Sequence, residues 1–204
     1  MSLILLLLLS ALPAIAGELH ITVFGDSLTA GYGLSEKAAF PARLEEALRQ
    51  HGFAVRVSNA GVSGDTSADG LARLDWSLSD RPDLLILELG ANDALRGLDP
   101  QLTRRNLGKI LSRLHQLRIP ALLAGMKAPR NLGADYYTKF DGLYPELAHQ
   151  YGVPLYPFFL TGVAGDPKLN QADGMHPNAA GVEVIVREIL PLVEKCLRQL
   201  PQRG

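Results

Sequence analysis

The stretch HITVFGDSLTAGYG, residues His20 to Gly33, starts as an apolar run and changes abruptly at Gly25, Asp26 and Ser27. A short apolar run that ends in glycine and polar residues is typical of a buried β-strand followed by a loop. The same change occurs twice more, at NAGVSGDTS and at GANDALRG. We therefore expect three strands that each end in a polar, glycine-containing loop.

The rest of the sequence alternates between β-rich runs and amphipathic stretches, which is the pattern of βαβ units and a mostly parallel sheet. Runs such as LLILELG are almost continuously apolar, as expected for strands that helices cover on both faces. The sequence thus predicts an α/β fold with a five-stranded parallel sheet flanked by helices. The predicted strands are Leu19–Phe24, Ala54–Ser58, Leu84–Leu89, Ala121–Ala124 and Val153–Tyr156.

Helices are predicted where apolar residues recur at helical spacing. The stretch 134–151 has this pattern, and we expect Pro145 to break it. Pro177 is expected to open the last helix within its first turn. The apolar stripes are Phe40, Leu44, Ala47 and Leu48; Leu107, Ile110, Leu111, Leu114 and Leu117; and Val182, Ile185, Val186, Ile189 and Val193.

Composition narrows the class of protein. With 204 residues, of which 47% are hydrophobic, the chain is long enough for one well-packed core. The net charge is −1 and the basic residues are scattered, so we expect no nucleic-acid partner. Cys196 is the only cysteine, which excludes an internal disulfide, and we expect it in the core. The oligomeric state is not readable from the sequence.

Residues 1–16 differ from everything that follows. Leu3–Leu9 is an apolar block, and Pro13 and the small residues Ala14 and Ala16 come after it. This pattern resembles a secretory signal peptide and is too short for a transmembrane helix. No Lys or Arg precedes the block, which leaves a buried N-terminal helix as the alternative. We expect cleavage near Ala16, a single domain at 17–204, and a periplasmic or secreted protein without a stable membrane anchor.

The three predicted loops should meet, because ligands in open α/β sheets bind beyond the carboxyl ends of the strands. A phosphate-binding loop is the first candidate. The Walker pattern requires Lys and then Ser or Thr after its last glycine, but Leu34 and Ser35 follow Gly33. The dinucleotide pattern requires a third glycine where Glu36 stands. Neither nucleotide motif is present.

A metal site is the second candidate. The side chains that could approach the same edge are Asp26, Asp65, Asp93, Asp173 and His176. Carboxylates of this kind serve two-metal hydrolases, although binuclear sites commonly use several imidazoles. The other four histidines fall at a strand start or in helical stretches, so we expect no bound metal.

Nucleophilic catalysis is the third candidate, and it requires a hydroxyl, a base, a group that orients the base and donors for an oxyanion. Ser27 offers the hydroxyl at a strand-to-helix turn, although serine there is also a common helix cap. Asp173 and His176 stand three residues apart in DGMHP, a spacing that lets the carboxylate reach one ring nitrogen. Taken singly, each of these signals is weak.

Taken together, GDSLTAGYG, NAGVSGDTS, LELGANDALRG and DGMHPNAAG resemble the four sequence blocks of the GDSL, or SGNH, hydrolase family. The match spans essentially the whole chain after residue 16. It looks closest to the bacterial thioesterase I, lysophospholipase L1 and arylesterase group, with SGDTSADGLARL and YPELAHQYGVPLYPFF as supporting stretches.

The resemblance implies a three-layer, flavodoxin-like fold and a serine esterase without metal or organic cofactor. It implies Ser27 as nucleophile, His176 as general base and Asp173 as the residue that orients it. It further implies the Gly64 backbone N–H and the Asn92 amide as oxyanion donors. Asp26, Gly61 and Asp65 are interpreted as residues that shape the loops.

The expected substrate is a small acyl ester or thioester bound near Leu95, Leu98, Met126 and Leu132, or else these residues only pack their loops. Three alternatives stay open. They are a carbohydrate O-deacetylase of the same fold, a metal-dependent phosphoesterase and a non-catalytic acyl- or glycan-binding module.

Overall fold

A computed structural model describes residues 17–200 of the chain. The predicted signal peptide, residues 1–16, lies outside the described residues. Among residues 17–200, no helix combines the length and the apolar character needed to span a bilayer.

The centre of the fold is a parallel sheet in the order β2-β1-β3-β4-β5. All five predicted strands are present, with ends that differ from prediction by three residues at most. The order 2-1-3-4-5 is that of flavodoxin-like sheets, in which strands are added on one side of β1 and then on the other, so that the strand order reverses between β1 and β3. The strand bounds are β1 Leu19–Gly25, β2 Val55–Gly61, β3 Leu84–Glu88, β4 Ala121–Ala124 and β5 Leu155–Tyr156.

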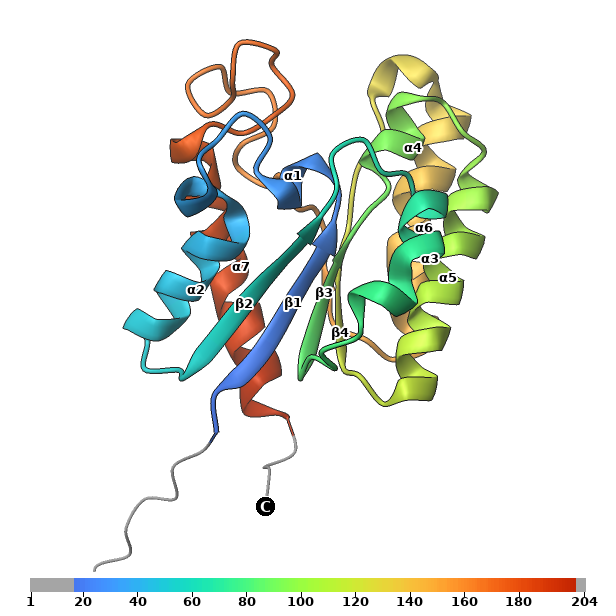
Figure 1. The fold of residues 1–204 in the computed structure, drawn as a ribbon. Coiled ribbons are helices and arrows are strands. Elements are labelled where there is room, and N and C mark those ends of the chain that lie inside the picture. Colours follow the sequence, from blue (N-terminus) through green and yellow to red (C-terminus); the bar gives the residue numbers. More distant parts are fainter. Residues whose placement is uncertain (1–16, 201–204) are drawn as a thin grey trace, which may run out of the picture.

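Helices cover both faces of the sheet, which gives the three predicted layers (Figure 1). One face carries α2 (Phe40–Gln50) and α7 (Ala179–Arg198), and the other carries α3 (Ser67–Ser77), α5 (Pro100–Leu117) and α6 (Ala134–Tyr151). The short helices lie in the loops beyond the strands' carboxyl ends. They are α1 (Ser27–Ala30), the 3₁₀ turn Glu36–Ala38, α4 (Ala91–Leu95) and the 3₁₀ turn Arg130–Leu132.

The core lies where the helices meet the sheet. All five residues of β3 are buried, and so are the predicted faces of α2, α5 and α7 apart from the half-buried Ala47 and Leu117. Cys196 packs in this core with 6% of its surface exposed, as predicted. Burial on both faces explains the continuous apolar run of β3, and it makes the single Glu88 in that run conspicuous.

The expected break at Pro145 is wrong, because α6 runs without interruption from Ala134 to Tyr151. An internal proline removes one backbone hydrogen bond and crowds the preceding turn. On both sides of Pro145, however, buried residues attach the helix to the core, with Tyr144 before it and Leu147 after it. This packing outweighs the local cost.

The last helix begins later than predicted. Pro177 lies before it, Asn178 is the N-cap, and the first helical residue is Ala179. The Asn178 side chain accepts a hydrogen bond from the Gly181 backbone N–H at 3.0 Å, which satisfies one free donor of the first turn. The capping side chain, and not the proline, therefore fixes the start of α7.

Candidate active site

Ser27 is the first residue of α1, directly after the carboxyl end of β1. Asp26 is the N-cap, and its carboxylate accepts a hydrogen bond from the Leu28 backbone N–H at 3.0 Å. Gly25 is required at the preceding position, because a Cβ there would overlap the Thr29 hydroxyl and the Glu88 carboxyl group. The turn thus presents the Ser27 hydroxyl at the end of the strand, with 9% of the residue exposed.

Ser27, His176 and Asp173 form a chain of hydrogen bonds. The Ser27 Oγ lies 3.0 Å from His176 Nε2, and His176 Nδ1 lies 2.7 Å from Asp173 Oδ2. The three residues come from opposite ends of the chain, since Ser27 follows β1 and the other two precede α7. A hydroxyl, an imidazole and a carboxylate in this order can activate the hydroxyl as a nucleophile.

The turn that contains Asp173 fixes its carboxylate. Asp173 Oδ1 accepts hydrogen bonds from the backbone N–H groups of Met175 at 2.9 Å and His176 at 3.0 Å. These bonds, with the added contact to the His176 ring, lower the pKa of Asp173 to about 2. Asp173 therefore stays ionised throughout the neutral pH range, and its charge lies next to the His176 imidazole.

Two residues that the sequence analysis missed attach this turn to the loop of Ser27. The Gln171 side-chain amide donates to the Tyr32 carbonyl at 2.7 Å and to the Pro177 carbonyl at 3.0 Å. The Tyr32 ring also lies against the His176 ring, with 4.6 Å between the centroids. Both contacts hold the Ser27 loop and the Asp173–His176 turn in place relative to each other. Both depend on a long-range loop contact that has no local sequence signal.

Asn92 lies in α4, at the end of β3, and its side chain faces the Ser27 loop. Its amide Nδ2 donates to Asp26 Oδ2 at 3.2 Å and to the Asp65 carbonyl at 3.0 Å. Gly64 has a φ of +90°, a backbone conformation that favours glycine, and its carbonyl accepts from Arg96 at 2.8 Å. Within residues 17–200, no acceptor is bonded to the backbone N–H of Ser27 or of Gly64.

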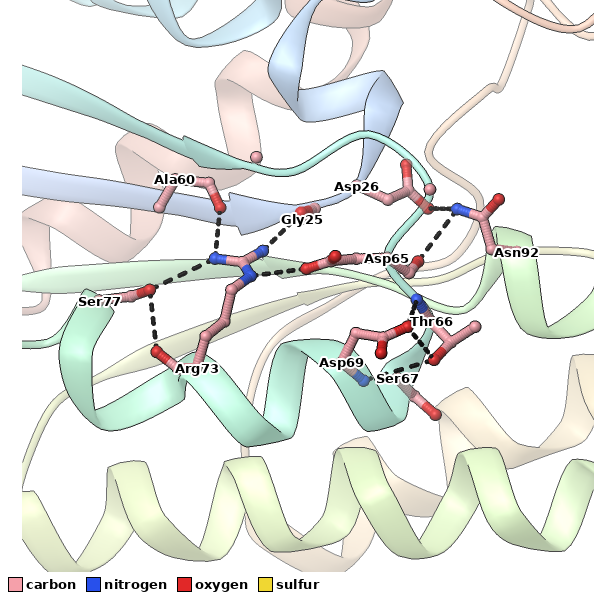
Figure 2. Close-up of polar contacts among 12 residues, drawn as sticks. Gly25, Asp26, Ala60, Asp65, Thr66, Ser67, Asp69, Arg73, Ser77 and Asn92 are labelled. Atoms are coloured by element: carbon pink, nitrogen blue, oxygen red, sulfur yellow. Dashed lines mark hydrogen bonds and ion pairs between the residues drawn. The ribbon is translucent and has the colours of Figure 1, made fainter.

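Arg73 of α3 connects the ends of β1 and β2 to this region (Figure 2). Its guanidinium donates to the carbonyls of Gly25 at 2.9 Å and Ala60 at 3.0 Å, and it binds the Asp65 carboxylate at 2.6 Å. Asp65 in turn offers its carbonyl to Asn92, so one cation fixes both strand ends and the support of the Asn92 amide (Figure 2). The supporting stretch SGDTSADGLARL contains Arg73, although the sequence did not single it out.

Two carboxyl groups are buried beneath the Ser27 turn. Glu88 is fully buried, and its Oε2 accepts from the Thr29 hydroxyl at 2.7 Å and from the Asp26 backbone N–H at 3.3 Å. Its Oε1 has no partner among the described residues. Burial, together with the neighbouring Asp26, raises the pKa of Glu88 well above its ordinary value. Burial likewise raises the pKa of Asp26 to about 6.

This burial predicts an unusual dependence of stability on pH. In the unfolded chain Asp26 and Glu88 ionise near their ordinary pKa values of 3.8 and 4.5. The folded protein keeps their protons to higher pH, so the free energy of unfolding should fall as the pH rises from about 4 through the raised values. Glu88→Gln copies the protonated carboxyl group. We expect this substitution to raise the melting temperature at pH 8 and to change it little at pH 5. Thermal unfolding at both pH values measures the difference.

Glu88→Leu is the control for that experiment, because it fills the site without an acceptor for Thr29 and Asp26. It should destabilise the protein at both pH values. If Glu88→Gln instead lowered the melting temperature most at pH 8, Glu88 would be an ionised structural carboxylate.

A cavity of about 760 Å³ opens beside Ser27, Asn92 and His176. Leu95 and Met126 line it as predicted, whereas Leu98 and Leu132 are not part of the lining described. The sequence analysis missed further apolar wall residues, which are Leu28, Phe158, Leu160 and Met175. Phe158 and Leu160 belong to YPFFLTG, an aromatic run directly after the short β5 that could have been noticed. The wall suits an acyl chain.

The five residues considered for a metal site do not converge. Asp93 accepts instead from the Ser67 backbone N–H at 2.8 Å and from the Thr103 hydroxyl at 3.0 Å, and Asp65 pairs with Arg73. Among residues 17–200, no three His, Cys, Asp or Glu side chains are grouped so that they could hold a metal ion.

Comparisons with known proteins agree with this geometry. The model of the GDSL-like Lipase/Acylhydrolase family matches residues 23–184. An arylesterase of Vibrio mimicus is 40% identical over 178 residues, which covers 87% of this chain and 88% of that protein. Thioesterase 1/protease 1/lysophospholipase L1 of Escherichia coli is 40% identical, covering 85% of this chain and 84% of its own length.

A solved structure gives the same result. The crystal structure of AlinE4, described as an SGNH-hydrolase family esterase, has a TM-score of 0.76 and 51% sequence identity. The match covers 90% of this chain and 99% of AlinE4. The family match over most of the chain, the level of identity and the shared fold lead to one conclusion: the chain belongs to the GDSL-like lipase/acylhydrolase family of ester hydrolases.

Proposed function

We propose that this ester hydrolase cleaves acyl esters and thioesters through an acyl-enzyme on Ser27. The observation that carries the proposal is the hydrogen-bonded chain of Ser27, His176 and Asp173 at the edge of a mainly apolar cavity. A nucleophile, its base and the orienter of the base are thus adjacent to a wall that can hold the acyl group.

In the first half-reaction His176 Nε2 takes the proton of the Ser27 hydroxyl while Oγ attacks the acyl carbonyl carbon. The tetrahedral intermediate collapses, the bond to the alcohol or thiol breaks, and the leaving group takes the proton from His176. In the second half-reaction His176 removes a proton from water, and the hydroxide attacks the acyl carbon. The bond between that carbon and Ser27 Oγ then breaks, His176 returns the proton to Oγ, and the acid is released.

The oxyanion needs donors that are already in place. We assign this role to the backbone N–H groups of Ser27 and Gly64 and to the Asn92 amide. The two backbone groups have no acceptor within the described chain, which supports the assignment. Asn92 lines the cavity with Ser27, and its Nδ2 donates to Asp26 Oδ2 at 3.2 Å and to the Asp65 carbonyl at 3.0 Å. Since the amide has only two N–H groups, it serves the oxyanion by giving up the longer of these bonds, the one to Asp26, when substrate binds. Gly64 is not among the described lining residues of the cavity, so its N–H would reach the oxyanion from the edge of the cavity.

The relatives named above are an arylesterase and a thioesterase/lysophospholipase, which supports a small-molecule acyl ester or thioester as the substrate class. We test it with a chain starting at Gly17. We expect hydrolysis of p-nitrophenyl esters and of an acyl thioester, unaffected by a chelator, because the proposed mechanism uses only side chains and backbone groups. The dependence of kcat/KM on acyl length then measures the depth of the cavity.

The alternatives give different results in that assay. A metal-dependent phosphoesterase loses activity with the chelator and prefers phosphate esters. A carbohydrate O-deacetylase cleaves acetylated sugars in preference to longer acyl esters. A folded chain that binds these ligands without turnover would contradict the proposal and favour a binding module.

We also propose that residues 1–16 direct export and are removed near Ala16, which places the mature enzyme in the periplasm or outside the cell. The apolar block and the small residues before Gly17 support this. Sequencing the N-terminus of the chain recovered from its producing cells tests it, and a retained leader on the folded enzyme would contradict it.

A further inference from the structure

The cavity beside Ser27 has an uneven distribution of charge. Two of the lining residues described, Lys127 and Arg130, carry a full charge at neutral pH, and both are cations. No aspartate or glutamate belongs to the lining described. The carboxylates of Asp173 and Asp26 lie behind the lining, bonded to His176 and Asn92, so the charged groups of the wall itself are these two cations.

Arg130 is already neutralised by its surroundings. Its guanidinium lies 2.7 Å from the Asp141 carboxylate and 4.4 Å from the centroid of the Tyr137 ring. The other Asp141 oxygen accepts from the Ala128 backbone N–H at 2.9 Å. Arg130 therefore serves to attach this loop to α6, and its charge is shared with Asp141.

Lys127 has no such partner. Its ammonium lies 5.0 Å from the centroid of the Phe158 ring, which also lines the cavity. Within residues 17–200, none of the ion pairs of the structure includes Lys127. A cation over an aromatic face keeps its N–H groups available, so Lys127 is an unpaired positive charge at the wall.

The backbone around Lys127 is well anchored. Met126 and Ala128, on either side of it, are 3% and 4% exposed, and the Ala128 N–H is bonded to Asp141. The exposed lysine side chain thus starts from a fixed segment that follows β4, which keeps its ammonium within reach of this part of the cavity wall.

We propose that Lys127 forms an anion subsite, so that the enzyme prefers esters that carry a phosphate or carboxylate group besides the ester bond. The proposal rests on the proposed ester hydrolysis and specifies its substrate class. An ammonium is a compact charge that suits either anion, while the apolar wall takes the hydrocarbon part. The anion can belong to the acyl group or to the leaving group.

Two matched pairs of substrates test the subsite. The first is 1-hexanoylglycerol and 1-hexanoylglycerol 3-phosphate, and the second is p-nitrophenyl hexanoate and the p-nitrophenyl monoester of adipic acid. We expect the enzyme to prefer the anionic member of at least one pair in kcat/KM. Lys127→Gln should lower the ratio of kcat/KM for that member to kcat/KM for its neutral partner about three- to fivefold. The preference should weaken at high salt.

Lys109→Gln is the matched control, because it removes the same charge from an exposed position on α5 outside the cavity lining described. An effect confined to the glycerol pair assigns the subsite to the leaving group, and one confined to the p-nitrophenyl pair assigns it to the acyl group. Equal turnover of both members, or equal effects of Lys127→Gln and Lys109→Gln, overturns the subsite alone. If no neutral ester is cleaved either, the proposed function itself fails.

Discussion

Ser27→Ala is expected to lower kcat for ester hydrolysis by a factor on the order of 10⁶ while the protein stays folded. The Ser27 hydroxyl is bonded to His176 and holds no other element in place, so its removal takes away the nucleophile and little else. The small rate that remains comes from binding and the oxyanion donors, which the substitution leaves intact. Steady-state kinetics with a p-nitrophenyl ester, beside a thermal unfolding curve, measure both quantities.

The variant that combines Ser27→Ala with His176→Ala tests whether the two side chains act together. His176→Ala should cost about as much as Ser27→Ala, and the two together should cost no more than either, because serine and imidazole act as one unit. Losses that multiplied in the double variant would mean that Ser27 and His176 act in separate steps, and a Ser27→Ala enzyme with most of its turnover would remove Ser27 from the mechanism. His149→Ala, on α6 and outside the cavity lining described, is the matched control.

The strands of this fold could be predicted from the sequence because burial on both faces leaves a continuous apolar run, as in LLILELG. The bounds of α6 also match the predicted helical stretch 134–151, but the effects of Pro145 and Pro177 could not be predicted. A proline has a strong local meaning, yet Pro145 stays inside α6 because Tyr144 and Leu147 pack in the core. At α7 the Asn178 side chain, and not Pro177, determines the first turn. Tertiary packing thus keeps α6 continuous at Pro145, and one capping hydrogen bond sets the first residue of α7.

For the site, the sequence offered candidates for the reacting residues, but not for the residues that hold them in place. Ser27, Asp173 and His176 stand in short motifs, and the parallel sheet order brings those motifs to one edge. Arg73 and Gln171 act through contacts 48 and 139 residues away in the chain, for which no local pattern exists. Glu88 did have a signal, since an acidic residue within a fully buried strand requires partners or a proton.

Asp173→Asn is expected to lower kcat/KM by roughly 10⁴ with little change in structure. Asp173 Oδ1 is held by the backbone N–H groups of Met175 and His176, so the single oxygen of an asparagine must take that position. The amide NH₂ group then faces His176 Nδ1 and donates to it. This holds the imidazole in the tautomer with a proton on Nε2, which cannot accept the proton of Ser27.

Because the pKa of Asp173 is held at about 2, the native enzyme should show no loss of activity from protonation of Asp173 between pH 5 and 8. Kinetics over that range measure both effects, with Asp166→Asn as the control, since Asp166 caps only the Lys168 backbone N–H. If Asp173→Asn kept most of its activity, the carboxylate would serve to shape the turn, and His176 would find its tautomer without it.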